Sequence, residues 1–147
     1  MKKSLIAIAA ILLGHTGFSQ NTSTLLSKYI SVKDALVQSD NKIAAEAINT
    51  FYKAIKTEPD FAQKADLLKV TEKLNQASDL KSQRAAFNDV STTMWTVVKN
   101  AEKVSQPVYY QYCPMKKGYW LSNEKDIKNP YYGSAMLTCG KVVETKE

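Results

Sequence analysis

The chain contains little of what usually builds an active site. Its 147 residues include one histidine, His15, and two cysteines, Cys113 and Cys139. His15 falls inside an N-terminal stretch that we expect to be removed on export, which would leave the mature protein without histidine. Histidine is both the commonest general base and the commonest metal ligand, so its absence excludes a Ser-His-Asp triad and any histidine-based zinc or iron site.

The sequence also lacks the motifs of the common nucleotide-binding and hydrolase classes. It contains no glycine-rich phosphate loop and no G-x-S-x-G nucleophile elbow. Glu124 and Asp126 have no partner base, and isolated loop carboxylates are usually solvated. We therefore expect a protein that is not an enzyme.

The N-terminus has the pattern of a secretory signal. Two lysines at positions 2 and 3 precede an apolar run from Leu5 to Leu13, and small residues suited to signal peptidase follow, ending at Ser19. The apolar run is shorter than the about 20 residues that a membrane-spanning helix needs. We expect a signal peptide at 1–19 and a single mature domain at 20–147, periplasmic and without a transmembrane span.

The mature chain has no strong excess of charge. Cleavage removes two lysines and no acidic residue, which lowers the formal net charge from +6 to about +4. The remaining lysines are spread along helical stretches, as on a solvated surface, rather than clustered as in a nucleic-acid or membrane patch. We expect no nucleic-acid partner.

Apolar residues recur at helical spacing in four segments, which predicts helices at about 22–38, 41–57, 61–77 and 79–104. Pro59 cannot continue the second helix, and Ser78 or Asp79 can cap the start of the fourth. The fourth helix has the most regular pattern, with an apolar residue at every seventh position from Leu80 through Phe87 and Met94 to Ala101. Met94 is therefore expected in the core.

A polar pair interrupts this apolar stripe. Gln83 occupies a position where an apolar residue is expected, and Arg84 follows it. We interpret the two as a buried, hydrogen-bonded structural pair that fixes the helix register, with a ligand contact as the alternative.

The C-terminal part differs in composition from the helical part. Residues 107–147 hold six of the eight tyrosines and both cysteines. "VYYQY" and "GYWL" are strand-like, and "NPYYG" is typical of a turn. Because short connections between amphipathic helices favour antiparallel neighbours, we predict an all-α, up-and-down four-helix bundle. An irregular, partly β extension at 107–147 would pack on it and cover it with aromatic side chains.

Four sulfur-containing residues lie in two short stretches of this extension. "YCPM" contains Cys113 and Met115, and "MLTCG" contains Met136 and Cys139. In an oxidising compartment two cysteines most often form a disulfide, which here would close a loop of 27 residues. Free buried thiols are another alternative.

A disulfide does not account for the two methionines. Thiolate and thioether sulfur select soft ions such as Cu(I) or Ag(I), and a site built from these four side chains needs no histidine. Zinc fits less well, since only two thiolates are present and thioethers rarely bind zinc. Methionine is also a common gap-filler beside aromatic rings, so the pattern leaves the disulfide and the soft-metal site both open.

The same stretches carry a family resemblance. "YCPM", Trp120 in "YWLS", "NPYYGSAMLTCG" and the helical "QRAAFNDVS" together make the chain, from about Leu25 to Val143, resemble an uncharacterised family of exported bacterial domains. That family is a numbered domain of unknown function, found alone or fused to CusB-like periplasmic subunits of heavy-metal efflux systems. The resemblance implies an association with copper or silver handling.

The family's recurring positions are all present in this chain. Its recurring sulfur residues fall on Cys113, Met115, Met136 and Cys139, and its recurring polar pair on Gln83 and Arg84. The leading hypothesis is a periplasmic protein that binds Cu(I) or Ag(I) and passes it to a membrane-fusion subunit of an efflux system. The alternative is a disulfide-stapled, non-enzymatic interaction module of an envelope complex. A redox-switched site, oxidised when empty and metal-binding when reduced, combines the two.

Overall fold

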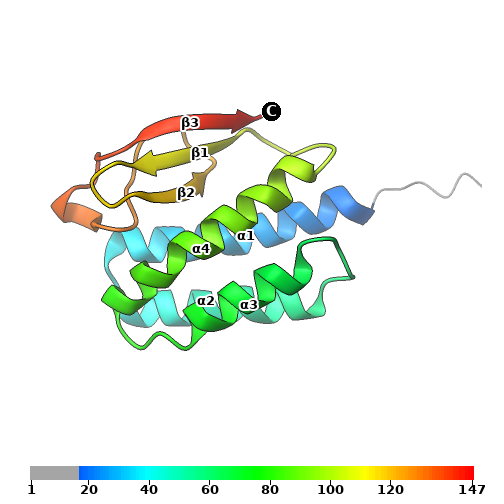
Figure 1. The fold of residues 1–147 in the computed structure, drawn as a ribbon, viewed down its shortest axis with the longest axis horizontal. Coiled ribbons are helices and arrows are strands. Elements are labelled where there is room, and N and C mark those ends of the chain that lie inside the picture. The colour runs from blue at the N-terminus through cyan, green and yellow to red at the C-terminus, as the bar shows by residue number, and fades with distance from the viewer. Residues whose placement is uncertain (1–16) are drawn as a thin grey trace, which may run out of the picture.

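The computed structural model describes residues 17–147 of the chain, with side chains from residue 21 onward. Four helices come first, and a small antiparallel sheet follows them (Figure 1). The elements are α1 (Gly17–Gln38), α2 (Asn41–Thr57), α3 (Lys64–Asn75), α4 (Leu80–Asn100), β1 (Val108–Cys113), β2 (Gly118–Ser122), the 3-10 turn η1 (Gly133–Ala135) and β3 (Lys141–Lys146). The predicted four-helix bundle with a partly β C-terminal extension is confirmed.

The predicted signal peptide at 1–19 falls mainly on residues 1–16, which lie outside the described part of the chain. Helix α1 begins at Gly17. Within residues 17–147, no helix combines the length and the apolar character needed to cross a bilayer.

Local sequence signals set the helix ends. Asp40 caps α2 by accepting a hydrogen bond from the Ile43 N–H at 2.9 Å, and α2 ends at Thr57, ahead of Pro59. Asp79 and Ser82 form a reciprocal capping box at the start of α4. Helix α4 ends at Asn100, four residues earlier than the pattern predicts, because Ala101 adopts an extended conformation with ψ 136°.

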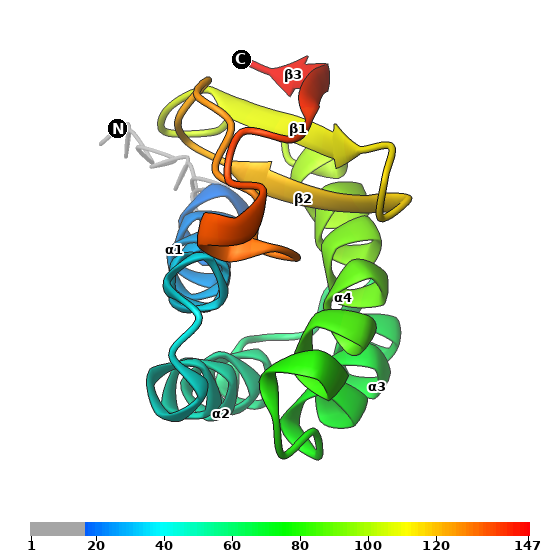
Figure 2. The ribbon, with the colours of Figure 1, turned by 90° about the vertical axis from the view of Figure 1, so that its left-hand side faces the viewer.

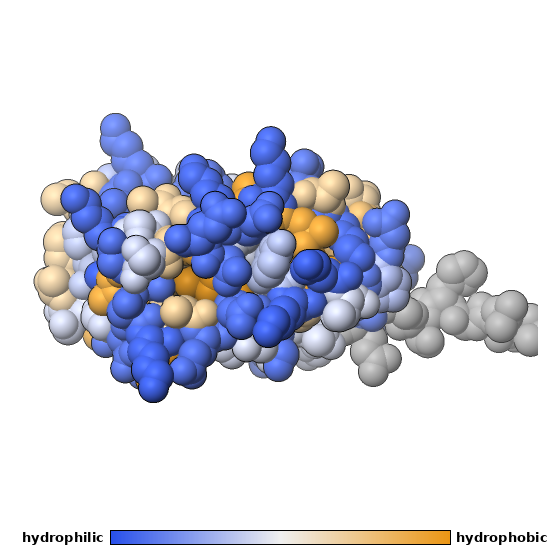
Figure 3. All heavy atoms as spheres, turned by 90° about the horizontal axis from the view of Figure 1, so that it is seen from below, coloured by the Kyte–Doolittle hydropathy of each residue, from blue (hydrophilic) through white to orange (hydrophobic). Residues whose placement is uncertain are grey.

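The four helices form two layers (Figure 2). Helices α1 and α4 lie next to the sheet, and α2 and α3 form the layer farther from it. The centre is aromatic: the Tyr29 ring stacks on Phe87 at 5.2 Å between centroids and meets Phe51 edge-on at 6.1 Å. Met94 is fully buried in this core, as its place in the seven-residue pattern predicts. Seen from the side of α2 and α3, the surface is mostly hydrophilic with small separate apolar spots (Figure 3).

The sheet has the strand order β2-β1-β3, and both strand pairs are antiparallel. Strands β1 and β2 form a hairpin whose turn contains Lys117 in a left-handed conformation, with φ 55°. Strand β3 was not predicted, because most of Lys141–Lys146 is exposed and lacks a clear apolar alternation. Its pairing with β1 makes the extension more regular than the sequence suggests.

The two faces of the sheet have different neighbours. Side chains alternate along a strand, so Tyr110 and Cys113 lie on opposite faces. On one face Tyr110 stacks between Trp95 of α4, at 4.7 Å, and Tyr119, at 4.9 Å. On the other face the segment 123–140 covers the strands, and the buried Gln111 donates to the carbonyls of Glu124 and Lys125, each at 3.1 Å. The thiol of Cys113 lies under this covering segment.

A candidate dithiol site

The structure brings the two cysteines into contact. The sulfur atoms of Cys113 and Cys139 are 3.2 Å apart, and both residues are free thiols. Strand pairing explains the contact: Tyr112 of β1 lies opposite Lys141 of β3, so the residue after Tyr112 meets the segment just before β3. Cys113 is fully buried and Cys139 is half-buried.

The separation of the sulfurs suits two chemical outcomes. A disulfide requires about 2.05 Å between sulfurs. Two thiolates on one tetrahedral ion with metal–sulfur bonds of about 2.3 Å lie roughly 3.8 Å apart. The observed 3.2 Å lies between these values, so a shift of about an ångström, shared between two side chains, reaches either arrangement.

A buried asparagine holds the second cysteine in place. The Asn129 side chain is fully buried, and its Nδ2 donates to the carbonyl oxygen of Cys139 at 2.7 Å. Its Oδ1 accepts from the N–H of Tyr131 at 2.8 Å. Its own backbone N–H donates to the Leu137 carbonyl at 2.8 Å, which ties together the two ends of the loop that carries Met136. The Asn-Pro pair indicates a turn from sequence alone, but residue type and spacing predict no role for the Asn129 side chain.

The surroundings make the two thiols unequal. Burial alone would raise the pKa of Cys113, but hydrogen bonds from the backbone of Lys116, from Cys139 and from the Asn129 side chain outweigh it and lower that pKa. The hydrogen bond to Cys113 and burial raise the pKa of Cys139. The pair therefore loses its first proton from Cys113, and the resulting thiolate accepts a hydrogen bond from the Cys139 thiol.

The backbones of Met115 and Met136 lie beside the two cysteines. Met115 lies on the β1–β2 turn, its backbone approaches both sulfurs, and 67% of the residue is exposed. The carbonyl of Met136 accepts from the Cys139 N–H at 3.1 Å, and this residue is half-buried. All four sulfur-containing residues thus belong to one small region, with the thiols in contact and the Met115 side chain largely in solvent.

Of the two polar residues Gln83 and Arg84, only Arg84 makes the hydrogen bonds expected of the pair. Arg84 connects the bundle to the extension: its Nε donates to the Pro130 carbonyl and its Nη2 to the Leu36 carbonyl, both at 2.8 Å. The Gln83 amide is fully buried, and neither its nitrogen nor its oxygen has a hydrogen-bond partner among the described residues. The expected hydrogen bond of Gln83 is therefore absent, because α4 turns this side chain into the apolar helix interface.

Two further contacts lock the extension onto the bundle, and neither was predicted. The Tyr29 hydroxyl lies 2.6 Å from the Ser91 hydroxyl and accepts from the Leu121 N–H at 3.1 Å, which ties β2 to α1 and α4. At Gly133, where φ is +53°, an added Cβ would lie 2.5 Å from the Ser39 hydroxyl oxygen and 2.8 Å from the Val37 carbonyl oxygen. A glycine is required there for the loop to approach the end of α1.

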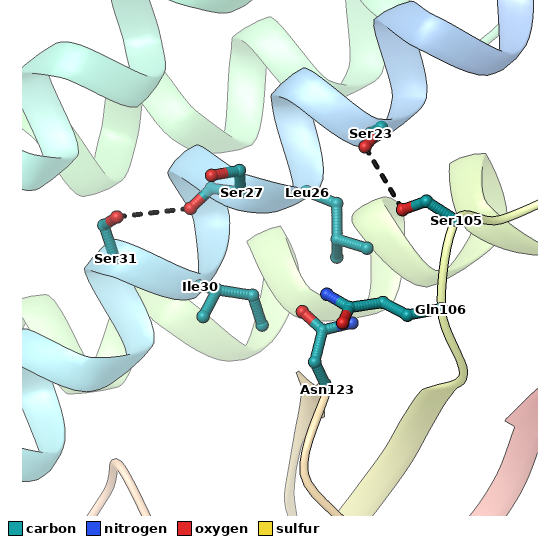
Figure 4. Close-up of a pocket in the computed structure, with 8 residues that line it drawn as sticks. All are labelled: Ser23, Leu26, Ser27, Ile30, Ser31, Ser105, Gln106 and Asn123. Carbon is teal, nitrogen blue, oxygen red and sulfur yellow. Dashed lines mark hydrogen bonds between the residues drawn. The ribbon is translucent and has the colours of Figure 1, made fainter.

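A separate cavity of about 440 Å³ lies between α1 and the link from α4 to β1 (Figure 4). Ser23 of α1 and Ser105 of the link meet at one side of it, with 3.4 Å between their hydroxyl oxygens. Serine, asparagine and glutamine side chains supply its polar lining, and no thiol, carboxylate or cationic side chain lines it. It therefore offers hydrogen bonds but no group suited to metal binding or acid–base chemistry.

No three His, Cys, Asp or Glu side chains come together in the described residues as a metal-binding group. A metal bound at the dithiol would take two sulfur ligands from Cys113 and Cys139, and Met115 and Met136 are sulfur-containing residues whose backbones lie beside them.

The fold and the site define the class of protein: a four-helix bundle that carries a dithiol on a small C-terminal sheet. The helical part, residues 25–106, matches the model of the family described as a protein of unknown function, DUF3347, and the chain belongs to that family. The match ends before β1, so the cysteines lie outside it. No curated protein and no solved structure matches the chain.

Proposed function

We propose that this protein is a periplasmic binding protein for a soft monovalent metal ion, Cu(I) or Ag(I), linked to heavy-metal efflux. The observation that carries the proposal is the 3.2 Å contact between the thiols of Cys113 and Cys139, which come from opposite ends of a 27-residue loop. The protein acts as a carrier and not as an enzyme.

The four sulfur residues have distinct roles in this proposal. Cys113 and Cys139 are the thiolate ligands, and Met115 and Met136 are the thioether ligands. Thiolate and thioether sulfur discriminate against hard ions such as Mg²⁺ and Ca²⁺, which prefer oxygen. The exposed Met115 side chain is unbranched and flexible, so it can turn toward a bound ion without a change in the backbone.

The difference in pKa between the two thiols sets the order in which they would bind a metal ion. Cys113, whose pKa is lowered, supplies the first thiolate. A cation placed between the sulfurs replaces the hydrogen bond, and the Cys139 proton leaves to solvent. Arg84 and Asn129 contribute indirectly, since they hold the loop that positions Cys139.

Export and partner belong to the same proposal. The predicted signal at 1–19 supports a periplasmic location, the compartment from which the proposed efflux system would take up copper or silver. The partner is a membrane-fusion subunit of an efflux system, which receives the ion. The family resemblance to domains fused to such subunits supports this assignment.

An anaerobic Cu(I) competition titration of the reduced protein tests the proposal. A chromophoric Cu(I) chelator reports how much metal the protein withdraws, for the wild type, for Cys139→Ser and for Met94→Leu. We expect one Cu(I) per chain in the wild type, a loss of affinity of at least 100-fold in Cys139→Ser, and no change in Met94→Leu, whose thioether lies in the core. Equal Cu(I) uptake by the Cys139→Ser variant would overturn the proposal.

The same contact favours a second function, the disulfide-stapled interaction module. A crosslink between Cys113 and Cys139 needs only a small approach of the sulfurs and would fix the loop that covers the sheet. Thiol labelling of protein taken from the periplasm separates the two functions. Labelling without prior reduction indicates a resting dithiol, and labelling only after reduction indicates the staple. A protein labelled only after reduction that then binds Cu(I) would be the redox-switched site.

A further inference from the structure

The dithiol lies at an end of the molecule with its own surface character. The β1–β2 turn and the segment around η1 share this end, which faces the viewer in Figure 2. Two of the large apolar side chains exposed on the described surface flank the thiols: Met115, 67% exposed, follows Cys113, and Leu137, 39% exposed, precedes Cys139. Each lies two residues from a cysteine, and the two cysteine sulfurs are 3.2 Å apart, so these exposed side chains give the surface near the dithiol an apolar centre.

Lysines border this apolar centre. Lys116 and Lys117 continue the turn after Met115, and Lys141 opens β3 opposite Tyr112; all three are exposed. Salt bridges of the described residues do not include any of them. Residues 113–123 and 127–143, which build this end, contain no acidic residue.

The acidic residues that border these segments are largely neutralised by other contacts. Glu144 pairs with Lys99 of α4 at 2.9 Å, and Glu124 pairs with Lys128. The pKa of Lys128 is raised mainly by its hydrogen bond to Glu124, and the charge of the exposed Asp126 adds to that rise. The charge that remains around the dithiol is positive.

From this arrangement we infer that the end formed by Met115, Leu137, Lys116 and Lys141 is a docking surface for an acidic protein partner that receives the metal ion. The inference rests on the proposed function. An apolar centre with a charged rim is the usual layout of a transient interface, in which rim charges set the association rate and the register. The half-buried Cys139 is the thiol that such a partner reaches first, because Cys113 is fully buried.

Two synthetic acceptor peptides probe the inference. Both carry the same Cys-x-x-Cys sequence; one is flanked by glutamates and the other by lysines. The rate of Cu(I) transfer from the loaded protein to each peptide is measured by stopped flow at low and high salt. We expect the glutamate-flanked peptide to receive Cu(I) at least 10-fold faster at low salt, and the difference to shrink toward 1 M salt as the charges are screened.

Charge-reversal variants locate the surface. Lys116→Glu combined with Lys141→Glu is expected to abolish the preference for the acidic peptide. The preference is the ratio of the two transfer rates from the same loaded protein, so a change in Cu(I) affinity alone would alter both rates alike and leave the ratio unchanged. The matched control, Lys69→Glu with Lys73→Glu on α3, makes the same change of charge at exposed positions on the opposite layer. Lys117 is left unchanged because of its left-handed backbone. Equal transfer to both peptides, or an equal loss in the α3 control, would overturn the inference.

A second measurement keeps the docking surface testable if the protein fails to bind copper. Fluorescently labelled peptides with both cysteines replaced by serine are titrated onto the metal-free protein and followed by anisotropy. We expect the acidic peptide to bind more tightly than the basic one, and this preference to vanish in the Lys116→Glu, Lys141→Glu variant. Failure of copper loading with retained peptide preference would reject the proposed function alone, whereas absence of any preference would reject the docking surface.

Discussion

The Nε of Arg84 donates a hydrogen bond of 2.8 Å to the carbonyl oxygen of Pro130. Arg84 lies inside the part of the chain that matches the family, residues 25–106, and Pro130 lies beyond it. The same guanidinium binds the Leu36 carbonyl and the Ser39 hydroxyl through Nη2, each at 2.8 Å. One side chain therefore connects the end of α1, helix α4 and the loop that positions Cys139.

Replacing Arg84 with alanine is expected to loosen this loop. The variant loses charge-assisted hydrogen bonds and leaves two backbone carbonyls without their donor, which costs about 1.5–3 kcal/mol of unfolding free energy. Urea unfolding of the reduced protein measures the loss, and the alkylation rate of Cys139 should rise. Arg84→Lys keeps the charge but has a single donor nitrogen. Its unfolding free energy should lie between those of the wild type and Arg84→Ala. A change below about 0.5 kcal/mol, typical of a surface substitution, would contradict this role.

The unequal thiols predict a two-step titration. Thiolate absorbance in the ultraviolet should rise first below the ordinary thiol pKa, as Cys113 ionises, and again above it, as Cys139 ionises. Because the pKa of Cys113 is lowered on folding, its contribution to stability is present above the ordinary thiol pKa and is lost as pH falls through the lowered value. The raised pKa of Cys139 acts oppositely: its contribution is present below the ordinary value and is lost as pH rises through the raised one. A single step at the ordinary thiol value in the folded protein would show that the thiols do not interact.

Oxidation should crosslink the dithiol without disturbing the fold. The 27-residue loop between the cysteines gives an expected stabilisation of about 3–4 kcal/mol at 25 °C. Thermal melting in the presence and absence of reductant should therefore differ by roughly 10 °C, with a loss of two hydrogen masses in the oxidised protein. Cys139→Ser serves as the control, since its melting temperature should not respond to reductant. An oxidised form that melts at or below the reduced form would mean that the crosslink distorts the site.

Asn129 should affect the dithiol, whereas Asn123 should not. Asn129→Ala removes the hydrogen bond to the Cys139 carbonyl and the amide beside the Cys113 thiol. We expect the first thiol titration step to move to higher pH and the Cu(I) affinity to fall by about 10–100-fold, as for other residues that orient metal ligands. Asn123→Ala removes a comparable hydrogen bond, to the Pro107 carbonyl at 3.2 Å, and should leave both measurements unchanged. Similar effects from both variants would indicate a general loss of stability.

Sequence patterns determined the helical part of this fold closely. The apolar stripe of α4 predicted the burial of Phe87 and Met94, and Asp79 and Pro59 marked helix ends correctly. Such signals are local, because they depend on side-chain period and on backbone groups within one turn. The end of α4 was placed too late, because Val104 continues the apolar spacing although the chain is already extended at Ala101.

For the candidate site, the sequence predicted which sulfur-containing residues take part but not how they are arranged. The spacing of the cysteines suggested a shared role, but their contact depends on the pairing of β1 with β3, and Lys141–Lys146 carries no strand signal of its own. Gln83 was expected to form hydrogen bonds, and its buried amide has no partner among the described residues. Asn129 was given no role, yet its side chain holds Cys139 in place. Hydrogen bonds between segments far apart in the sequence follow from tertiary packing, which residue type and spacing do not encode.

X-ray absorption at the copper edge, on anaerobically loaded wild-type protein, tests the soft-metal site most directly. We expect a copper ion in the Cu(I) state whose bound atoms are all sulfur, and a lower sulfur count in Met115→Leu and in Met136→Leu. Coordination dominated by oxygen or nitrogen, or a spectrum unchanged by both methionine substitutions and by Cys139→Ser, would contradict it.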